Sequence, residues 1–148
     1  MKLKVKVKLL RENARLPEYK TEEAAACDLC AATDSPIILP AGERALVPTG
    51  ISIECEGEKN LAVLLFARSG LASKHGIALT NGVGVVDTDY RGEIKVALVN
   101  LSGEDYTVSP GDRIAQMMFV PIEKAEFEIC SELNDTDRGD GGFGHTGS

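Results

Sequence analysis

Apolar and charged residues alternate strictly at the start of the chain. The first residues read MKLKVKVKLL, where every second position from residue 3 to residue 9 is apolar and the positions between them are lysines. A period of two residues predicts a β-strand with one buried face and one charged face. Lysines are common on edge strands, where they discourage pairing with other chains. A basic arm for nucleic acid or lipid is the alternative that these lysines leave open.

Short alternating or continuous apolar runs recur along the rest of the chain. Turn-forming sequences such as LPAGE, EGEKN and SPGDR separate them, and in the last of these Pro110 and Gly111 occupy the central positions of a type II turn. Many short strands joined by tight turns predict an all-β sandwich or barrel. The expected strands are residues 37–39, 45–47, 51–55, 61–66, 77–79, 83–86, 93–100, 106–108, 113–120 and 125–129.

Two stretches depart from this strand pattern. RSGLASKHG, at residues 68–76, predicts one short helix that Ser69 could cap and Gly76 could end. At Ser131 an acidic, polar sequence, SELNDTD, leads into the glycine-rich end RGDGGFGHTGS. We therefore expect a β-domain over residues 1–130, followed by a flexible linker and C-terminal arm over residues 131–148.

The chain has 148 residues, of which 43% are hydrophobic, 26% charged and 5% aromatic, a composition typical of one soluble globular domain. Its formal net charge is −7, so its long-range field would repel nucleic acid and anionic membranes. No window resembles a transmembrane span or a secretory leader. We expect a cytoplasmic protein without a nucleic-acid or membrane partner, whose anionic ligands need local cations or a metal.

The four cysteines include a Cys-x-x-Cys pair, Cys27 and Cys30, which could indicate a redox pair or half of a zinc site. No second pair of closely spaced cysteines or histidines accompanies it. In a strand, residues three apart point to opposite faces. The favoured interpretation is therefore that the cysteines are small buried apolar residues in a reducing compartment.

The glycine-rich end contains GDGGFG, which matches the dinucleotide-binding pattern G-x-G-x-x-G. That interpretation fails because no strand leads into the match and no helix follows it. The segment still offers Arg138, which could bind a phosphate, and Phe143, which could stack on a base. Taken alone, it could equally be a frayed tail.

Three further stretches carry candidate chemistry. The RSG at residues 68–70 would present an arginine and free backbone N–H groups to an anion, or form only a salt bridge and a cap. NGVGVVDTDYRGEI would place Asp87 and Asp89 on one face if extended, with Tyr90 opposite, or form an ordinary acidic turn. GDRIAQ, at residues 111–116, could be simply a turn followed by a strand.

Together these stretches resemble the five motifs of the homotrimeric dUTP pyrophosphatases, the dUTPases. In chain order they are AACDLCA (residues 25–31), ARSGL (67–71), NGVGVVDTDYRGE (81–93), GDRIAQ (111–116) and RGDGGFGHTG (138–147). Each motif is weak alone, whereas five in this order and spacing are specific. Ala26 and Ala67 stand where the family usually has glycine and proline, and both changes are small.

The resemblance implies a fold, an assembly and a reaction. The fold would be a β-jelly roll of the β-clip type, assembled as a homotrimer whose active sites each take residues from three chains. The reaction would be dUTP diphosphatase chemistry, in which water attacks the α-phosphorus and dUTP yields dUMP and pyrophosphate. This reaction lowers dUTP and supplies dUMP for dTTP synthesis. Mg²⁺ is the implied cofactor, held mainly by the triphosphate.

The resemblance also implies roles for individual residues. Asp87 would orient and deprotonate the attacking water, Gln116 would contact the α-phosphate, and Asp28 would hold the Mg²⁺ complex through its water shell. The implied substrate contacts are Arg68, Ser69 and Gly70 at the phosphates; Asn81, Gly84 and Val86 at the uracil edge; Tyr90 at the deoxyribose; and Arg138, Phe143, Gly144, His145 and Thr146 in an arm that closes over a neighbouring subunit's site.

Two other functions remain as alternatives at this stage. A dCTP deaminase shares the fold, but its relatives use a catalytic glutamate and lack this glycine-rich arm. A non-catalytic, nucleotide-responsive binding protein is the other alternative. It would have no need to retain Asp87, Arg68, Tyr90 and Arg138 together.

Overall fold

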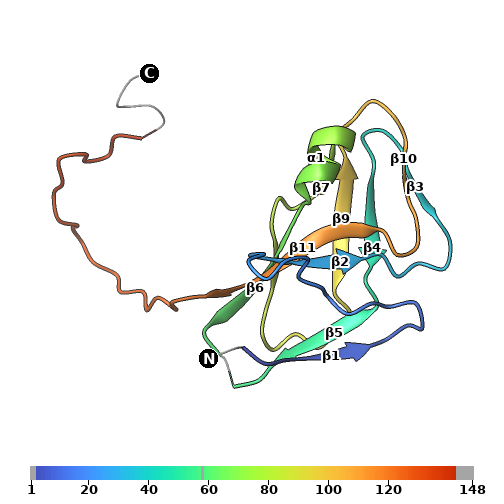
Figure 1. The fold of residues 1–148 in the computed structure, drawn as a ribbon. Coiled ribbons are helices and arrows are strands. Elements are labelled where there is room, and N and C mark those ends of the chain that lie inside the picture. Colours follow the sequence, from blue (N-terminus) through green and yellow to red (C-terminus); the bar gives the residue numbers. More distant parts are fainter. Residues whose placement is uncertain (1–2, 58, 143–148) are drawn as a thin grey trace.

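The computed structural model describes residues 3–57 and 59–142, and in these residues the chain is almost entirely β (Figure 1). In chain order the elements are β1 (Val5–Leu9), β2 (Cys27–Cys30), β3 (Ile37–Leu39), β4 (Arg44–Pro48), β5 (Ile51–Cys55), β6 (Leu61–Phe66), α1 (Ser69–His75), β7 (Ile77–Leu79), β8 (Gly84–Val86), β9 (Lys95–Asn100), β10 (Tyr106–Val108) and β11 (Arg113–Pro121). The expected all-β fold with one short helix is confirmed.

The strands pair in four small antiparallel sheets. Their orders are β2-β11-β6-β8, β4-β9-β7, β1-β5 and β10-β3. Most neighbours are distant in sequence, as where β11 lies between β2 and β6. This interleaving brings the segments around residues 28, 68 and 116 to the same end of one sheet, which positions the site described below.

The core consists of aliphatic side chains from alternate strand positions. In β6 the odd positions Leu61, Val63 and Leu65 are buried, while the residues between them are half-buried. β9 shows the same alternation, with Val96 and Leu98 fully buried. Alternation of this kind is the signature of strands with one face on a core, and it explains why most strand bounds follow from sequence.

The helix begins at Ser69, one residue earlier than expected, and its cap is correspondingly one residue earlier. Arg68, not Ser69, is the N-cap of α1, in an extended conformation, and no side chain caps the helix. Gly76 ends it as expected, with φ at 65° in the left-handed region that glycine tolerates best. The expected turn glycine, Gly111, likewise has a positive φ of 83°. The serine hydroxyl at residue 69 is therefore not used as the cap.

The expected strand over residues 125–129 is wrong. This segment is irregular and exposed, with Phe127 at 94% and Ile129 at 101% relative accessibility. Its apolar alternation is typical of a strand, but no strand lies alongside it in the described part of this chain. After β11 the chain leaves the body and extends away from it (Figure 1).

The cysteines are free thiols with different surroundings. Cys27 and Cys55 are buried, as expected, and burial raises the pKa of each thiol. Cys30 is partly buried, and Cys130 is exposed on the extended segment, where the expectation of burial is wrong. Among the described residues, no helix has the length and apolar composition needed to cross a membrane.

A buried amide fixes the loop that links β9 to β10. Asn100 is fully buried, and its Nδ2 donates to the carbonyls of Leu39 at 2.9 Å and Glu104 at 2.7 Å. Its Oδ1 accepts from the backbone N and the hydroxyl of Ser102, at 3.0 and 2.8 Å. One side chain thus joins β9 and β3 to the loop after β9.

We predict that Asn100→Ala lowers the free energy of unfolding by about 2–3 kcal/mol, because the substitution leaves buried carbonyls without a donor. Urea denaturation monitored by circular dichroism measures this loss. The control is Asn60→Ala at an exposed position, where a change within about 0.5 kcal/mol is expected. Equal stability of the two variants would contradict a structural role for the Asn100 amide.

Candidate active site

The carboxylate of Asp28 lies at the centre of a cluster of donors. Asp28 is in β2 and only 4% exposed. Its Oδ1 accepts from Arg68 Nε at 3.2 Å and from Gln116 Nε2 at 3.4 Å, and its Oδ2 accepts from Arg113 Nη1 at 3.0 Å. Three of the motifs recognised in the sequence therefore meet at one buried charge.

A β-bulge in β11 makes this convergence possible. Arg113 and Gln116 are three residues apart, so a regular strand would point their side chains to opposite faces. The register shifts between Arg113 and Ala115, so that Arg113 pairs with Cys30 while Gln116 pairs with Asp28. The inserted residue brings both side chains to the face of Asp28, as bulges near functional sites commonly do.

The third donor comes from the junction between β6 and α1. Arg68 is the extended residue before the helix, and its guanidinium also donates to the Arg113 carbonyl at 3.3 Å. Ser69 and Gly70 follow in the exposed first turn of α1, where backbone N–H groups lack intrahelical acceptors. The RSG motif therefore presents further donors beside the Asp28 cluster.

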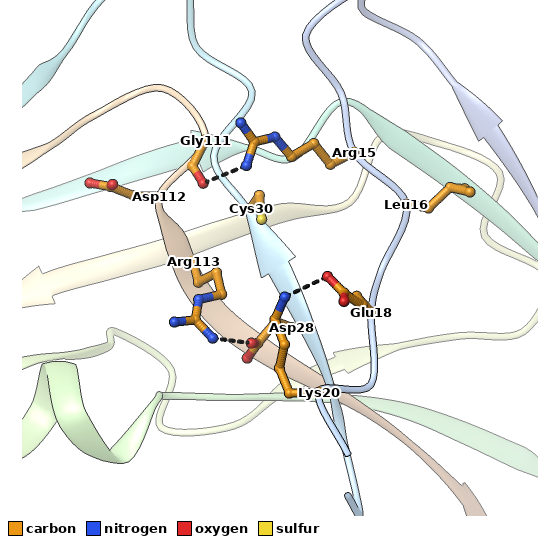
Figure 2. A pocket seen from close by; sticks show the side chains of 9 residues that line it. All are labelled: Arg15, Leu16, Glu18, Lys20, Asp28, Cys30, Gly111, Asp112 and Arg113. Carbon is orange, nitrogen blue, oxygen red and sulfur yellow. Dashed lines mark hydrogen bonds and ion pairs between the residues drawn. The ribbon is translucent and has the colours of Figure 1, made fainter. Parts of the chain in front are cut away.

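A polar cavity of about 570 Å³ opens beside Asp28 and Arg113 (Figure 2). The segment before β2 forms its opposite wall, where Arg15 points toward the Gly111 carbonyl and Lys20 points toward Glu18 in the close-up. Lys20 forms an ion pair with Glu18. Figure 2 also shows the ion pair between Arg113 and Asp28 at the middle of the cavity.

The uracil-binding candidates lie on and before β8. Asn81 is exposed in the turn between β7 and β8. Gly84 is buried, and a Cβ there would lie 2.9 Å from the Leu65 Cβ, so the glycine allows β8 to pack closely on β6. Val86, at the end of β8, lines a second cavity. The structure thus gives Gly84 a packing role that does not depend on ligand.

Asp87 and Tyr90 share that second cavity, of about 510 Å³, with Leu46 and Val85. Residues 87–90 form a turn in which the Tyr90 N–H donates to the Asp87 carbonyl at 3.1 Å. The chain is therefore not extended here, and the arrangement with Tyr90 opposite Asp87 is wrong. The turn brings the acid and the aromatic ring to one cavity.

Contacts to Glu93 hold the Tyr90 ring in place. The Tyr90 hydroxyl donates to the Glu93 carbonyl at 3.1 Å, and the ring occupies the space where any Cβ at Gly92 would lie. The Glu93 carboxylate accepts from Arg11 Nε at 2.9 Å and from the Gly50 N–H at 3.0 Å. The hydrogen bond from Arg11 is the main reason why the pKa of Glu93 lies below its usual range.

The two groups of candidate residues lie at opposite ends of β6. In the antiparallel pairing, Gly84 faces Leu65 and Val86 faces Val63, and Asp87 follows directly after Val86, which places it near the level of residue 62. Arg68 lies six residues beyond residue 62, which corresponds to about 20 Å at 3.3 Å per residue. Within one chain, the structure therefore brings Asp28, Arg68 and Gln116 together but separates them from Asp87.

The arm candidates are described only at Arg138. Its Nε donates to the Gly141 carbonyl at 2.8 Å within a local turn of the exposed segment. The other predicted arm contacts lie outside the described residues; they are Phe143, Gly144, His145 and Thr146. Sequence reasoning missed Arg113 as a site residue, although its place in GDRIAQ, next to Gln116, could have suggested it.

Comparison with known proteins gives one consistent family. The dUTPase family model matches residues 12–147. The deoxyuridine 5'-triphosphate nucleotidohydrolase of Desulfitobacterium hafniense (strain DSM 10664 / DCB-2) is 48% identical over 147 residues, covering 98% of this chain and 97% of the relative. The enzyme of the same name from Shigella flexneri is 44% identical over 151 residues, covering 99% of each.

Solved structures agree with this result. A mutant dUTPase of Staphylococcus bacteriophage 80alpha, solved with dUpNHpp, has a TM-score of 0.83 at 25% identity, covering 98% of this chain and 99% of that one. A mutant dUTPase of phage phi11 of S. aureus, described with a coordinated structural Mg(II) ion, has a TM-score of 0.79 at 25% identity, covering 89% and 99%.

We predict that Glu93→Gln flattens the dependence of stability on acid pH. Because the pKa of Glu93 is lowered in the folded protein, its contribution is present above the unfolded pKa, near 4.3, and is lost as pH falls through the folded pKa. Urea denaturation between pH 3 and pH 7 should show a smaller loss of stability in the variant than in wild type. Glu128→Gln, at an exposed position, should keep the wild-type curve; an unchanged curve for Glu93→Gln would contradict the prediction.

Proposed function

The chain belongs to the dUTPase family and is a dUTP nucleotidohydrolase, and from this premise we propose how its residues hydrolyse dUTP to dUMP and pyrophosphate. The observation that carries the proposal is the convergence of Arg68 and Gln116 on the buried carboxylate of Asp28. In the free protein these donors are held in place around one buried charge. When a nucleotide binds, its phosphates can accept hydrogen bonds from these donors, and its cation can replace the donors beside the carboxylate.

The phosphates would bind at the end of the sheet where Arg68 lies. An arginine can contact phosphate oxygens through two parallel hydrogen bonds. The exposed Ser69 and Gly70 add a hydroxyl and backbone N–H groups, and Gln116 adds an amide from β11. These groups compensate for the net charge of −7, which by itself disfavours an anionic substrate.

The donors around Asp28 fit an indirect contact with Mg²⁺. In the described residues, no three acidic, histidine or cysteine side chains cluster as a metal site, and both Asp28 oxygens accept from nitrogen donors. A cation bound to the triphosphate neutralises developing charge on the phosphates when present. We propose that Asp28 holds this complex through its water shell, with Mg²⁺ carried in by the nucleotide.

Asp87 would act as the general base from the other cavity. Aspartates are normally ionised at neutral pH, so this exposed carboxylate can accept a proton from a water molecule. The water oxygen forms a bond to the α-phosphorus while the bond from that phosphorus to the bridging oxygen breaks. Pyrophosphate leaves with the bridging oxygen, and dUMP retains the new oxygen from water.

Specificity would come from the cavity shared by Asp87 and Tyr90. The deoxyribose would stack on the Tyr90 ring, which Glu93 holds in place, and a 2′-hydroxyl would clash with the ring. Asn81 and the backbone of β8 would pair with the uracil edge. Cytosine reverses part of that donor and acceptor pattern, and unpaired buried polar groups can give discrimination on the order of 10⁴–10⁵.

We also propose that the active site forms between copies of the chain, in a homotrimer with shared sites. The separation of about 20 Å along β6 places Asp87 too far from the Asp28 cluster for both to act on one nucleotide within one chain. A neighbouring copy can bring its own Asp87 to the first chain's Arg68. In a closed symmetric assembly the same contact between neighbouring copies is repeated, so each Asp87 would meet the Arg68 of the next copy.

The third contribution would be the arm over residues 131–148, which we treat as separate from the β-domain over residues 1–130. Its described part is almost wholly exposed and extends from the body (Figure 1). We propose that it closes over a neighbour's site, where Arg138 contacts the γ-phosphate, Phe143 covers uracil, and Gly144, His145 and Thr146 add contacts.

The free thiols support a reducing location, and we propose the cytoplasm.

We predict that Asp87→Asn lowers the turnover of dUTP by roughly 10²–10⁴ while nucleotide affinity stays near wild type, since the amide cannot accept the proton. Phosphorus NMR of the reaction with Mg²⁺ measures pyrophosphate release, and calorimetry measures binding. The control is Asp105→Asn at an exposed loop position. Wild-type turnover in Asp87→Asn would move the base elsewhere.

The same assay on wild type tests the function itself. With dUTP, dCTP, UTP and dTTP offered in turn, dUMP and pyrophosphate should form efficiently from dUTP alone. Absence of pyrophosphate, or equal turnover of dCTP or UTP, would reject the proposed function. Ammonia released from dCTP would indicate a deaminase instead.

We predict that removal of residues 138–148 leaves the fold and the trimer intact and lowers dUTP turnover by roughly 10³-fold or more, because Arg138 no longer stabilises the charge that develops on the leaving pyrophosphate. Size-exclusion chromatography and the phosphate assay check the two parts. Arg138→Ala should reproduce part of the loss, whereas Lys124→Ala, an exposed cation nearer to β11, should not. Full activity after truncation would make the segment a simple tail.

A further inference from the structure

The two oxygens of the Asp28 carboxylate have different kinds of partner. Oδ1 accepts from Arg68 Nε and Gln116 Nε2, both of which are proposed phosphate ligands. Oδ2 accepts from Arg113 Nη1, at the shortest of the three distances, 3.0 Å. The two proposed phosphate ligands, Arg68 and Gln116, therefore donate to the same oxygen, Oδ1, whereas Arg113 donates to Oδ2.

Nucleotide binding would disturb only the first of these oxygens. When Arg68 and Gln116 turn toward phosphate oxygens, Oδ1 loses the donors that satisfy it in the free protein. Asp28 is only 4% exposed, so its charge needs another partner at that moment, because an unpaired buried charge is strongly unfavourable. Water bound to the substrate's Mg²⁺ offers donors of the required kind.

Arg113 is placed to remain in position during that change. Its position is set by the β-bulge and by the turn before β11, where the Asp112 carboxylate accepts from the Ser109 N–H at 2.8 Å. Other cations of the cavity do not contact Asp28 in the structure. Lys20 pairs with Glu18, and Arg15 reaches the Gly111 carbonyl at 3.5 Å (Figure 2).

We propose that Arg113 is a positioning residue that anchors Oδ2 of Asp28 while Oδ1 exchanges Arg68 and Gln116 for the hydrated magnesium of bound dUTP. This inference rests on the proposed function and deepens it. The ion pair between Arg113 and Asp28 fixes the carboxylate's orientation in both states. Arg68, by contrast, serves the carboxylate in the free protein and the phosphates in the complex.

The first test is a crystal structure of the full-length protein with Mg²⁺ and dUpNHpp. The contact between Arg113 Nη1 and Asp28 Oδ2 should persist, while Arg68 Nε moves beyond hydrogen-bonding distance of Oδ1 and a water ligand of Mg²⁺ takes its place. An Arg113 side chain turned from Asp28 onto the phosphates would overturn the proposal. So would an Arg68 still bonded to Oδ1.

The second test uses Arg113→Met, which removes the donor but keeps an unbranched side chain, and Arg113→Lys, which restores a charged donor. The Mg²⁺ concentration for half-maximal dUTP hydrolysis should rise roughly 10- to 100-fold in Arg113→Met, as when a group supporting a metal contact is lost. Arg113→Lys should recover most of this loss. The kcat at saturating Mg²⁺ should change less than the half-saturating concentration.

Binding of dUMP without metal distinguishes a positioning role of Arg113 from a general structural role. This ligand lacks the β- and γ-phosphates, so it does not carry the cation that Asp28 is proposed to hold. The dissociation constant of dUMP should be unchanged in Arg113→Met. The control is Arg44→Met, at an exposed arginine of β4, which should match wild type in every measurement. Weakened dUMP binding, or an unchanged Mg²⁺ requirement in Arg113→Met, would overturn the inference. Neither result would affect the proposed function, which is tested separately by the release of dUMP and pyrophosphate from dUTP, dCTP, UTP and dTTP with the wild-type protein.

Discussion

A buried negative charge at Asp28 constrains the arrangement of the whole site. A carboxylate that is only 4% exposed must be paired and hydrogen-bonded, because desolvation of an isolated ion is very unfavourable. Its donors come from the junction between β6 and α1 and from β11, which lies between β6 and β2 in the sheet. The sheet order and the bulge in β11 are therefore both required for the charge of the Asp28 carboxylate to be neutralised.

The same sheet places Asp87, the proposed base, far from that charge. β8 pairs with β6 in an antiparallel register, so the chain leaves β8 at the end opposite to Arg68. No side chain can span the resulting distance of about 20 Å. The exposed Leu46 and Val85, at 59% and 67%, flank the cavity of Asp87 and Tyr90. Apolar surface beside an incomplete site is what a contact between subunits would cover.

Much of this fold could be predicted from the sequence, because its information is local. The bounds of β3, β5, β6, β7 and β10 agree with the alternation of apolar residues and the turn sequences between them. The segment over residues 125–129 has the same alternation but no partner strand in the described chain, and a strand needs a partner. Local pattern cannot report whether that partner exists.

The site was less predictable from local pattern. Motif resemblance identified Asp28, Arg68 and Gln116. The three-residue spacing between Arg113 and Gln116 would by itself place their side chains on opposite faces of a regular strand. The bulge that brings them to one face arises from the pairing with β2, which a local pattern does not contain. The cap at Ser69 was wrong for a similar reason: Arg68 turns toward Asp28, and the chain enters the helix from that extended residue. In both cases a tertiary contact overrode a local preference.

The charge balance of the site explains how an acidic protein can bind a polyanion. With a net charge of −7, the chain gains nothing from long-range attraction of dUTP. The free site instead keeps two arginines close together, and the Asp28 carboxylate between them offsets their mutual repulsion. In the proposed binding mode, a triphosphate with its cation would bring a negative group for Arg68 and a positive one for Asp28, so each charged group would exchange one partner for another. Binding in this proposed mode would select for the metal complex over the bare nucleotide, since phosphate alone would take Arg68 and leave a buried carboxylate with one partner fewer.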